Sequence, residues 1–160
     1  MAVNAYIKIE GRPGPSPSKK DHIDILSFSF GASLPVTYQS GSSGRESSAG
    51  RASLSDVSIM KVTDKTSPLL FDDCVSGNVL KNVTLLYDKA TGDGQEDYFK
   101  IEMTDVLISS YQLSGSSENP TESLSFAFEK IKICYNPQGD DGKLQGFVEK
   151  GYDLATLKPF

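Results

Sequence analysis

The chain has 160 residues, a formal net charge of −5 at pH 7 and a pI near 4.9. This length is sufficient for a single domain spanning residues 1–160 with a substantial core. The acidic balance argues against a nucleic-acid partner, because binding to a phosphate backbone relies on clustered Lys and Arg. No apolar run approaches the roughly 18 residues of a membrane span, so no membrane insertion is expected.

The N-terminal segment, MAVNAYIKIEG, contains the first predicted strand. Residues Ala5–Glu10 alternate, with Ala5, Ile7 and Ile9 on one face, as in a half-buried β-strand. The same segment has no basic region followed by an apolar stretch, so no conventional signal peptide is predicted.

The second predicted strand, Asp24–Val36, contains the run ILSFSFG. Successive side chains of a strand point to opposite faces. The run therefore divides into an apolar face and a hydroxyl face, formed by Leu26, Phe28 and Phe30 and by Ser27 and Ser29 respectively. The residues alone leave the hydroxyl face open to two interpretations, an ordinary solvent-exposed strand face or a surface that contacts something else.

A segment dominated by Ser and Gly follows, YQSGSSGRESSAGRAS, from Tyr38 to Ser53. Its composition cannot bury a core of its own. It is therefore either a floppy hairpin tip between two strands or an extended arm that becomes ordered against another subunit.

One helix is predicted, over Ser67–Asn78. Ser67 is a suitable N-cap, Pro68 fits the first helical position, and Gly77 can end the helix in the left-handed conformation. The expected buried face consists of Leu69, Leu70 and Cys74.

Further β-rich runs cover much of the rest of the chain, over Ser53–Val62, Val79–Tyr87, Asp97–Leu113 and Glu122–Tyr135. Gly92 and Gly94 predict a hairpin turn between the second and third of these. In the last run the apolar phase slips at Glu129–Lys130, which indicates a bulge or a strand that passes from one sheet to another. Such strands are typical of closed or nearly closed barrels. The predicted fold is therefore mainly β, an antiparallel barrel of two packed sheets with one short peripheral α-helix.

No constellation of residues for catalysis is present. The single histidine, His22, lies beside Asp21 and Asp24, but no GxSxG motif accompanies it and an exposed histidine is expected there. No CxxC spacing supports a metal site, and no phosphate-binding loop is complete. We expect no enzyme activity, cofactor or metal. The acids of the pair Asp72–Asp73 are expected at the surface, and the two cysteines, Cys74 and Cys134, as free thiols.

Several segments together resemble the haemolysin-coregulated protein (Hcp) family, the inner-tube proteins of type VI secretion systems. The resemblance rests on HIDILSFSFGAS, SDVSIMKVTDKTSPLLFDDCVSGN, YFKIEMTDVLISSYQLSG, ESLSFAFEKIKICYNPQGDDGK and GYDLATLKPF, in this order along nearly the whole chain. The chain departs from the family pattern at Tyr152, where Trp is common, and in its proline-rich first loop, GRPGPSPS.

The resemblance implies a homohexameric ring, with rings stacked head to tail into a hollow tube that a contractile sheath expels. It implies effector proteins in the lumen, sheath and spike proteins as partners, and a protein that is cytoplasmic before firing and then secreted without a signal peptide. By the resemblance, Ser27 and Ser29 line the lumen, with Ser29 in contact with effectors. Likewise Arg45, Glu46 and Arg51, the charges of the Ser/Gly-rich loop at 38–53, contact a neighbouring subunit or ring.

Two alternatives remain open from the residues. One is a phage-tail-tube-like structural protein with the same barrel. The other is a monomeric β-barrel that binds a small ligand in its interior.

Overall fold

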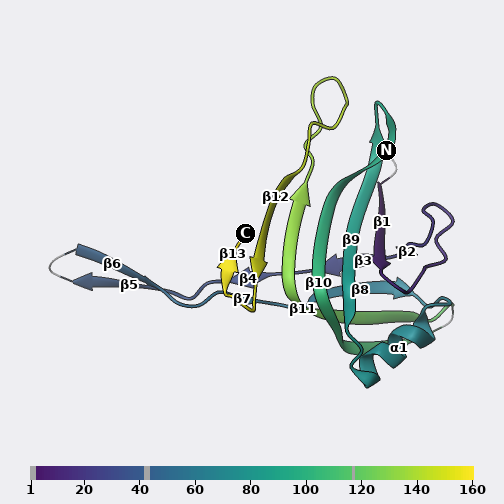
Figure 1. The fold of residues 1–160 in the computed structure, drawn as a ribbon, viewed down its shortest axis with the longest axis horizontal. Helices are drawn as coiled ribbons and strands as arrows, with labels where there is room; N and C mark the ends of the chain where they lie inside the picture. The colour runs from purple at the N-terminus through teal and green to yellow at the C-terminus, as the bar shows by residue number, and fades with distance from the viewer. Residues whose placement is uncertain (1–2, 42–43, 117) are drawn as a thin grey trace.

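The computed structural model describes residues 3–41, 44–116 and 118–160. Strands make up most of these residues, and the described part contains a single helix (Figure 1). In chain order the elements are β1 (Val3–Ile9), β2 (Ile23–Asp24), β3 (Ser27–Ser29), β4 (Ala32–Ser33), β5 (Val36–Gly41), β6 (Gly44–Ala49), β7 (Ser53–Leu54), β8 (Val57–Val62), α1 (Ser67–Ser76), β9 (Leu80–Thr91), β10 (Gly94–Ser114), β11 (Thr121–Tyr135), β12 (Val148–Asp153) and β13 (Lys158–Pro159). The predicted mainly β class with one short helix is confirmed.

The strands close into an antiparallel barrel. Neighbouring strands pair in the order β11, β10, β9, β1 and β2, while β3 pairs with β8 and β8 pairs with β11. The segment 23–29 joins the two ends of this path. The Ile25 amide donates to the Ala5 carbonyl oxygen (3.2 Å), and the Leu26 amide donates to the Met60 carbonyl oxygen (2.7 Å). One short stretch of chain therefore connects β1 to β8 and completes the ring of strands.

Strand β11 serves two sheets, as the phase slip predicted. Its first half pairs with β8, up to Phe126 opposite Val57, and its second half pairs with β12, from Lys130 opposite Asp153 onward. β10 follows β11 along both halves, and Figure 1 shows the two strands turning together. On β10 the turn falls at Asp105, whose φ is 51°. Burial changes phase at the same point, because Phe128 and Ile131 are both buried.

The core lies inside this barrel. Its fully buried members include Ile7, Ile9, Ile59, Val83, Leu85, Ile101, Met103, Leu124 and Phe126. Phe28 packs edge-on against Tyr87, with ring centroids 5.6 Å apart, and Phe30 packs against Phe128 at 6.1 Å. These contacts anchor the ILSFSFG strand in the core, as expected.

Leu26 does not share the face of Phe28 and Phe30, so that part of the prediction was wrong. Its side chain is 61% exposed. Met60 lies opposite Ser27 in the register and also accepts the hydrogen bond from the Leu26 amide. Two consecutive residues thus face one partner, as in a β-bulge, and the alternation is interrupted at this point.

The helix ends as predicted but begins differently. Gly77 is left-handed (φ 65°), and its amide donates to the Asp73 carbonyl oxygen. The N-cap is Thr66, however, and Ser67 is the first helical residue. The hydroxyl of Ser67 instead donates to the buried Glu122 carboxylate (2.8 Å). Leu69 is exposed, and Asp73 takes its place on the buried face.

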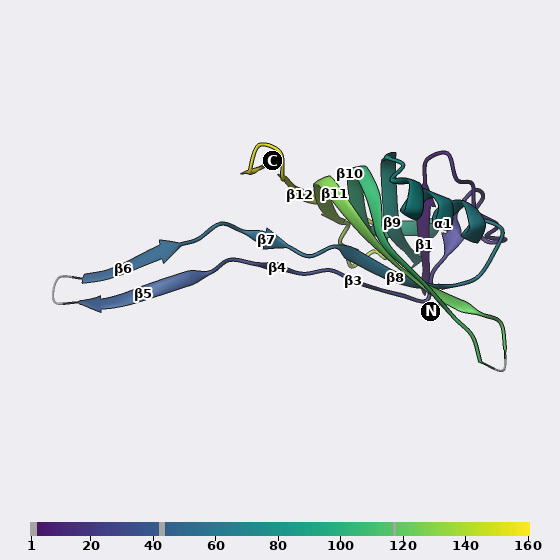
Figure 2. The ribbon, with the colours of Figure 1, turned by 90° about the horizontal axis from the view of Figure 1, so that it is seen from below.

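The Ser/Gly-rich segment forms a two-stranded ribbon. β5 and β6 pair with each other, from Val36 opposite Ala49 to Gly41 opposite Gly44. Figure 2 shows this ribbon projecting well away from the barrel. No strand of the barrel pairs with it among the described residues. The segment is thus an extended arm in shape and not an irregular tip.

Candidate lumen face and inter-subunit surfaces

The predicted lumen residues lie on an exposed sheet face. Ser27 and Ser29 are both exposed on β3. Across the sheet, Ser29 is opposite Ser58 of β8, Ser58 is opposite Ser125 of β11, and Ser125 is opposite Ser110 of β10. Residues opposite one another in an antiparallel sheet share a face. A row of serines therefore crosses four strands.

Around this row, the outward positions of the four strands are uncharged. We call this surface the hydroxyl face, and it comprises Ser27 and Ser29 of β3, Ser58, Met60 and Val62 of β8, Thr121, Ser123, Ser125 and Ala127 of β11, and Leu107, Ser110, Gln112 and Ser114 of β10. No Lys, Arg, Asp or Glu occupies any of these positions. The Ser58 and Ser125 hydroxyls lie 3.0 Å apart, so some of the donors already satisfy one another. Such a face offers weak hydrogen bonding and no fixed charge.

A buried ion pair lies on the inner side of the same sheet, opposite the hydroxyl face. Lys61 and Glu122, whose side chains are both 0% exposed, form a salt bridge between β8 and β11. Ser67 of α1 and the Tyr111 hydroxyl of β10 both donate to the Glu122 carboxylate. Burial, together with the neighbouring Glu122, raises the pKa of Tyr111 to about 12. The pair holds the helix against the inner side of the sheet.

The Lys61–Glu122 pair was not among the residues predicted from the sequence. The signal was nevertheless present in the alternation. Lys61 falls on the same strand face as Val57 and Ile59, both buried. A lysine at an inward position requires an acidic partner, because a buried charge is stable only when it is paired.

The sheet that carries the hydroxyl face has two open edges. Within the described residues β3 pairs only with β8, and positions 107–114 of β10 pair only with β11, since the pairing with β9 ends at Val106. Both edges therefore expose unpaired backbone amides and carbonyls. Such edges are able to pair with another chain.

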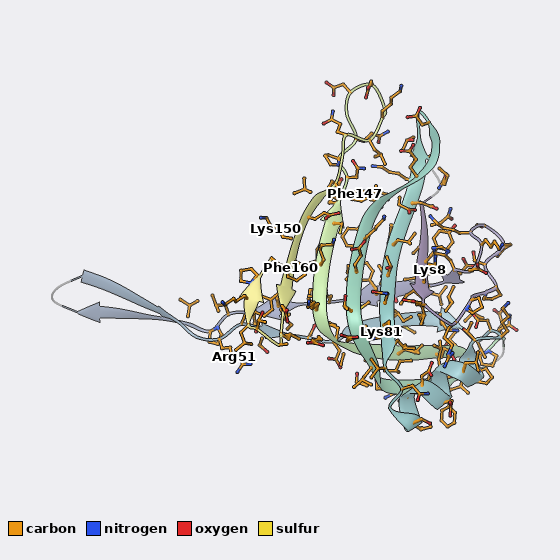
Figure 3. All side chains as sticks on the ribbon, viewed as in Figure 1. Lys8, Arg51, Lys81, Phe147, Lys150 and Phe160 are labelled. Carbon is orange, nitrogen blue, oxygen red and sulfur yellow. The ribbon has the colours of Figure 1, made fainter. Side chains whose placement is uncertain are left out.

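The predicted arm residues are placed only in part. The backbones of Arg45 and Glu46 lie in β6, opposite Ser40 and Gln39, but their side chains lie outside the described part of the structure. Arg51 is exposed at the base of the ribbon (Figure 3) and makes no ion pair among the described residues. The structure thus places these three residues on or beside the arm and shows no contact for them.

Two polar residues expected at the surface are buried. His22 is 8% exposed; its Nδ1 lies 2.7 Å from the Lys20 carbonyl oxygen and its ring packs edge-on against Tyr6. The pairing of β2 with β1 draws this residue inward, so the expectation of an exposed histidine was wrong.

Asp73 is also buried, with a side-chain exposure of 0%, and Arg12 binds it through two hydrogen bonds of 2.9 and 2.8 Å. Burial by itself would raise the pKa of Asp73. The hydrogen bonds from Arg12 and Asn78 outweigh this effect, so the pKa lies below its ordinary value. The contact ties the proline-rich first loop to α1.

Other expectations concern thiols, metals and membranes. Cys74 and Cys134 are free cysteines, as expected. Across residues 3–41, 44–116 and 118–160, no cluster of three or more His, Cys, Asp or Glu side chains is placed to hold a metal ion. In the same residues, no helix has the length and apolar character needed to cross a membrane.

Comparison with known proteins agrees with this geometry. Residues 6–135 match the family described as "Type VI secretion system effector, Hcp". The chain is 34% identical over 159 residues to Protein hcp1 of Pseudomonas aeruginosa, with 96% of each chain covered. A solved type six secretion system protein superposes with a TM-score of 0.86 at 30% identity, covering 99% of this chain and 100% of that one. Hcp1 from Salmonella typhimurium superposes with a TM-score of 0.79 at 27% identity, covering 100% of both chains.

Proposed function

Because the chain belongs to the Hcp family and is a tube protein of a type VI secretion system, we propose that six copies close into a ring whose lumen is lined by the hydroxyl face. Rings stacked head to tail then form the tube that a contractile sheath expels. Secreted effector proteins occupy the lumen, and sheath and spike proteins of the secretion machine are the outer partners. The role is structural and requires no catalytic residue.

The pair of open edges carries this proposal. β3 and positions 107–114 of β10 lie at opposite margins of the same four-stranded sheet. A head-to-tail contact joins two different surfaces, so the β3 edge of one copy can meet the β10 edge of the next. Repeating that contact around a closed ring makes the hydroxyl faces one continuous inner wall. The contact also removes both edges, which would otherwise promote aggregation.

The chemistry of the face suits a conduit for proteins. Its positions supply hydroxyls, one amide and a few apolar side chains, but no charge. A wall of this kind holds diverse cargo weakly, because neutral hydrogen bonds to a surface that is already hydrated give little net free energy. We assign Ser29, on the β3 margin of this face, to effector contact.

Solution mass and electron microscopy of the same sample test the proposal. The expected result is a particle of six times the 17.3 kDa chain, seen as a ring with an open centre. A monomer over a wide concentration range would overturn the ring and favour a ligand-binding barrel. Cross-linking with a lysine reagent before gel electrophoresis provides a second reading of the subunit number.

A further inference from the structure

The sheet extends beyond the barrel at β11 and β12 and leaves part of its inner face uncovered. In one register row, Phe99 is followed by Tyr135 and Val148; in the next, Ile101 is followed by Ile133 and then Lys150 of β12. Ile101 is 1% exposed, whereas Ile133 is 41%, Tyr135 is 47% and Val148 is 65% exposed. We call the surface formed by Ile133, Tyr135, Val148 and Lys150 the wing face. These side chains lie on the same face of the sheet as the buried Ile101, but beyond the edge of the core.

The opposite face of the same strands is mainly polar, as is usual for a solvent-exposed surface. There Lys132 forms ion pairs with Glu102 (3.1 Å) and Glu149 (3.3 Å), and the Lys100 ammonium lies 4.8 Å from the ring centroid of Phe147. In a half-buried antiparallel sheet, polar residues face water and apolar residues face a packed layer. The wing therefore has the pattern of a covered sheet. Within the described residues, however, the Tyr98 ring packs edge-on against Tyr135 (6.2 Å between centroids) and the apolar side stays largely exposed.

The wing is held firmly in place by the end of the chain. The Gly151 and Phe160 backbones exchange hydrogen bonds of 2.8 and 2.9 Å, and the Phe160 ring lies directly over Gly151. A Cβ at Gly151 would come within 2.5 Å of that ring, so only glycine permits this approach. The apolar side chains are thus presented by a fixed strand pair and not by a frayed end.

The position of the arm indicates which partner covers the wing face. The β5–β6 ribbon leaves the barrel at the end where β12 and β13 lie, as Figures 1 and 2 both show. An isolated two-stranded ribbon is marginally stable in water, so it also needs a partner on this side. The two open edges of the hydroxyl-face sheet are its lateral margins, formed by β3 and by positions 107–114 of β10. The arm instead extends in the direction in which β3 and β8 run (Figures 1 and 2). Ring closure through those edges leaves the end with the arm and the wing for a copy in the adjacent ring.

We propose that the wing face is a ring-to-ring contact, in which Ile133, Tyr135 and Val148 are buried against a second copy of this chain in the next ring. The inference rests on the proposed tube function. It assigns to stacking a surface separate from the edges that close the ring, with the arm and the wing gripping the same neighbour.

A matched pair of charge substitutions tests the inference. Val148 and Val75 are both 65% exposed, the first on the wing and the second on α1, so Val148→Glu and Val75→Glu place the same charge at equal exposure. For each variant we would measure the urea midpoint, the ring mass of the purified protein and its release into the medium by the native host. Val148→Glu is expected to fold and form rings like the wild type, with release reduced at least about tenfold, because an unpaired carboxylate at an apolar contact must be desolvated. Val75→Glu is expected to be released normally.

The outcomes separate the inference from the proposed function. Failure of the wild-type chain to form rings would defeat the proposed function itself. Wild-type rings together with normal release of Val148→Glu would overturn only the wing assignment. Loss of the ring in Val148→Glu would overturn it as well, by placing the wing in ring closure, and so would an equal loss of release in Val75→Glu.

Discussion

At the residue scale, the buried pair of Arg12 and Asp73 explains how a proline-rich loop is held on a barrel. Asp73 is wholly buried on α1, and Arg12 is the guanidinium that reaches it from the loop. Asn78 completes the set with a hydrogen bond of 3.0 Å. A carboxylate in this position depends on its partners, because an unpaired buried charge is strongly unfavourable.

Replacing Arg12 by Ala is therefore expected to lower the free energy of unfolding by about 2 kcal/mol. Lys81→Ala is the matched control, since Lys81 is 77% exposed and lies 3.8 Å from Asp105; it should change stability by less than about 0.5 kcal/mol. Urea unfolding at pH 7 measures both. Equal effects of the two substitutions would contradict a stabilising role for the buried pair.

The pH dependence of stability follows from the lowered pKa of Asp73. A carboxyl whose pKa is lower in the folded state stabilises the fold fully above its ordinary pKa of about 4 and loses that contribution as pH falls through the folded value. The Arg12→Ala variant should lose less stability than the wild type on acidification, because its Asp73 no longer has that cation. Unfolding curves at pH 7 and pH 3 give the two slopes.

Ser29 is the residue at which the lumen assignment can be tested directly. A Ser29→Gln side chain would project from the exposed face without disturbing Phe28, which is anchored on the opposite face by Tyr87. Ring mass should be unchanged, and co-purification of effector proteins should fall. Thr121→Gln, on the same face but at the far end of the strands, is the control for added bulk. Full recovery of cargo with intact Ser29→Gln rings would remove Ser29 from the effector contact.

At the element scale, the arm is the feature whose role can be separated from folding. β5 and β6 pair only with each other among the described residues. Deleting Ser42–Ala49 should therefore leave the thermal midpoint of the barrel within about 2 °C of the wild type. Because the arm is assigned to a neighbouring ring, the deletion should impair tube formation. Circular dichroism and electron microscopy measure the two effects, and unchanged tubes would show that the arm is dispensable for stacking.

Most elements were predictable because their signals are local. The β11 alternation and its slip at Glu129–Lys130 fixed both the strand and its change of partner. Gly77 marked the helix end through its backbone freedom alone. The exposed Ser27 and Ser29 followed from the same alternation.

Most of the predictions that failed concerned residues whose burial depends on contacts with distant parts of the sequence. Lys61 and Asp73 carry charged side chains, which are usually exposed. Each is nevertheless buried against a partner 61 positions away in the sequence, Glu122 for Lys61 and Arg12 for Asp73. Leu26 was misplaced because a bulge interrupts the period of two. Which open edge meets which, and what covers the wing, depends on a second chain. A single sequence carries no local signal for these contacts between chains.

At the scale of the whole molecule, the chain leaves more surface unfinished than a monomeric barrel would. Two strand edges, the arm and the wing face each lack a partner within the described residues. A monomer with these features would be prone to edge-to-edge aggregation. In the proposed assembly, rings and a tube give each of these surfaces a partner, and we therefore expect part of the stability of the native chain to come from its neighbours.

This dependence predicts that stability rises with protein concentration. A ring binds only the folded subunit, so mass action favours folding as the concentration increases. For a six-membered ring, a tenfold increase should add about 1 kcal/mol per subunit to the apparent free energy of unfolding. With an m-value of about 2 kcal/mol/M, the urea midpoint should rise by about 0.5 M per decade. Unfolding curves at three concentrations spanning two decades measure this shift. A midpoint that does not move would mean that the barrel folds without help from other copies, because the folding of an isolated chain is independent of concentration.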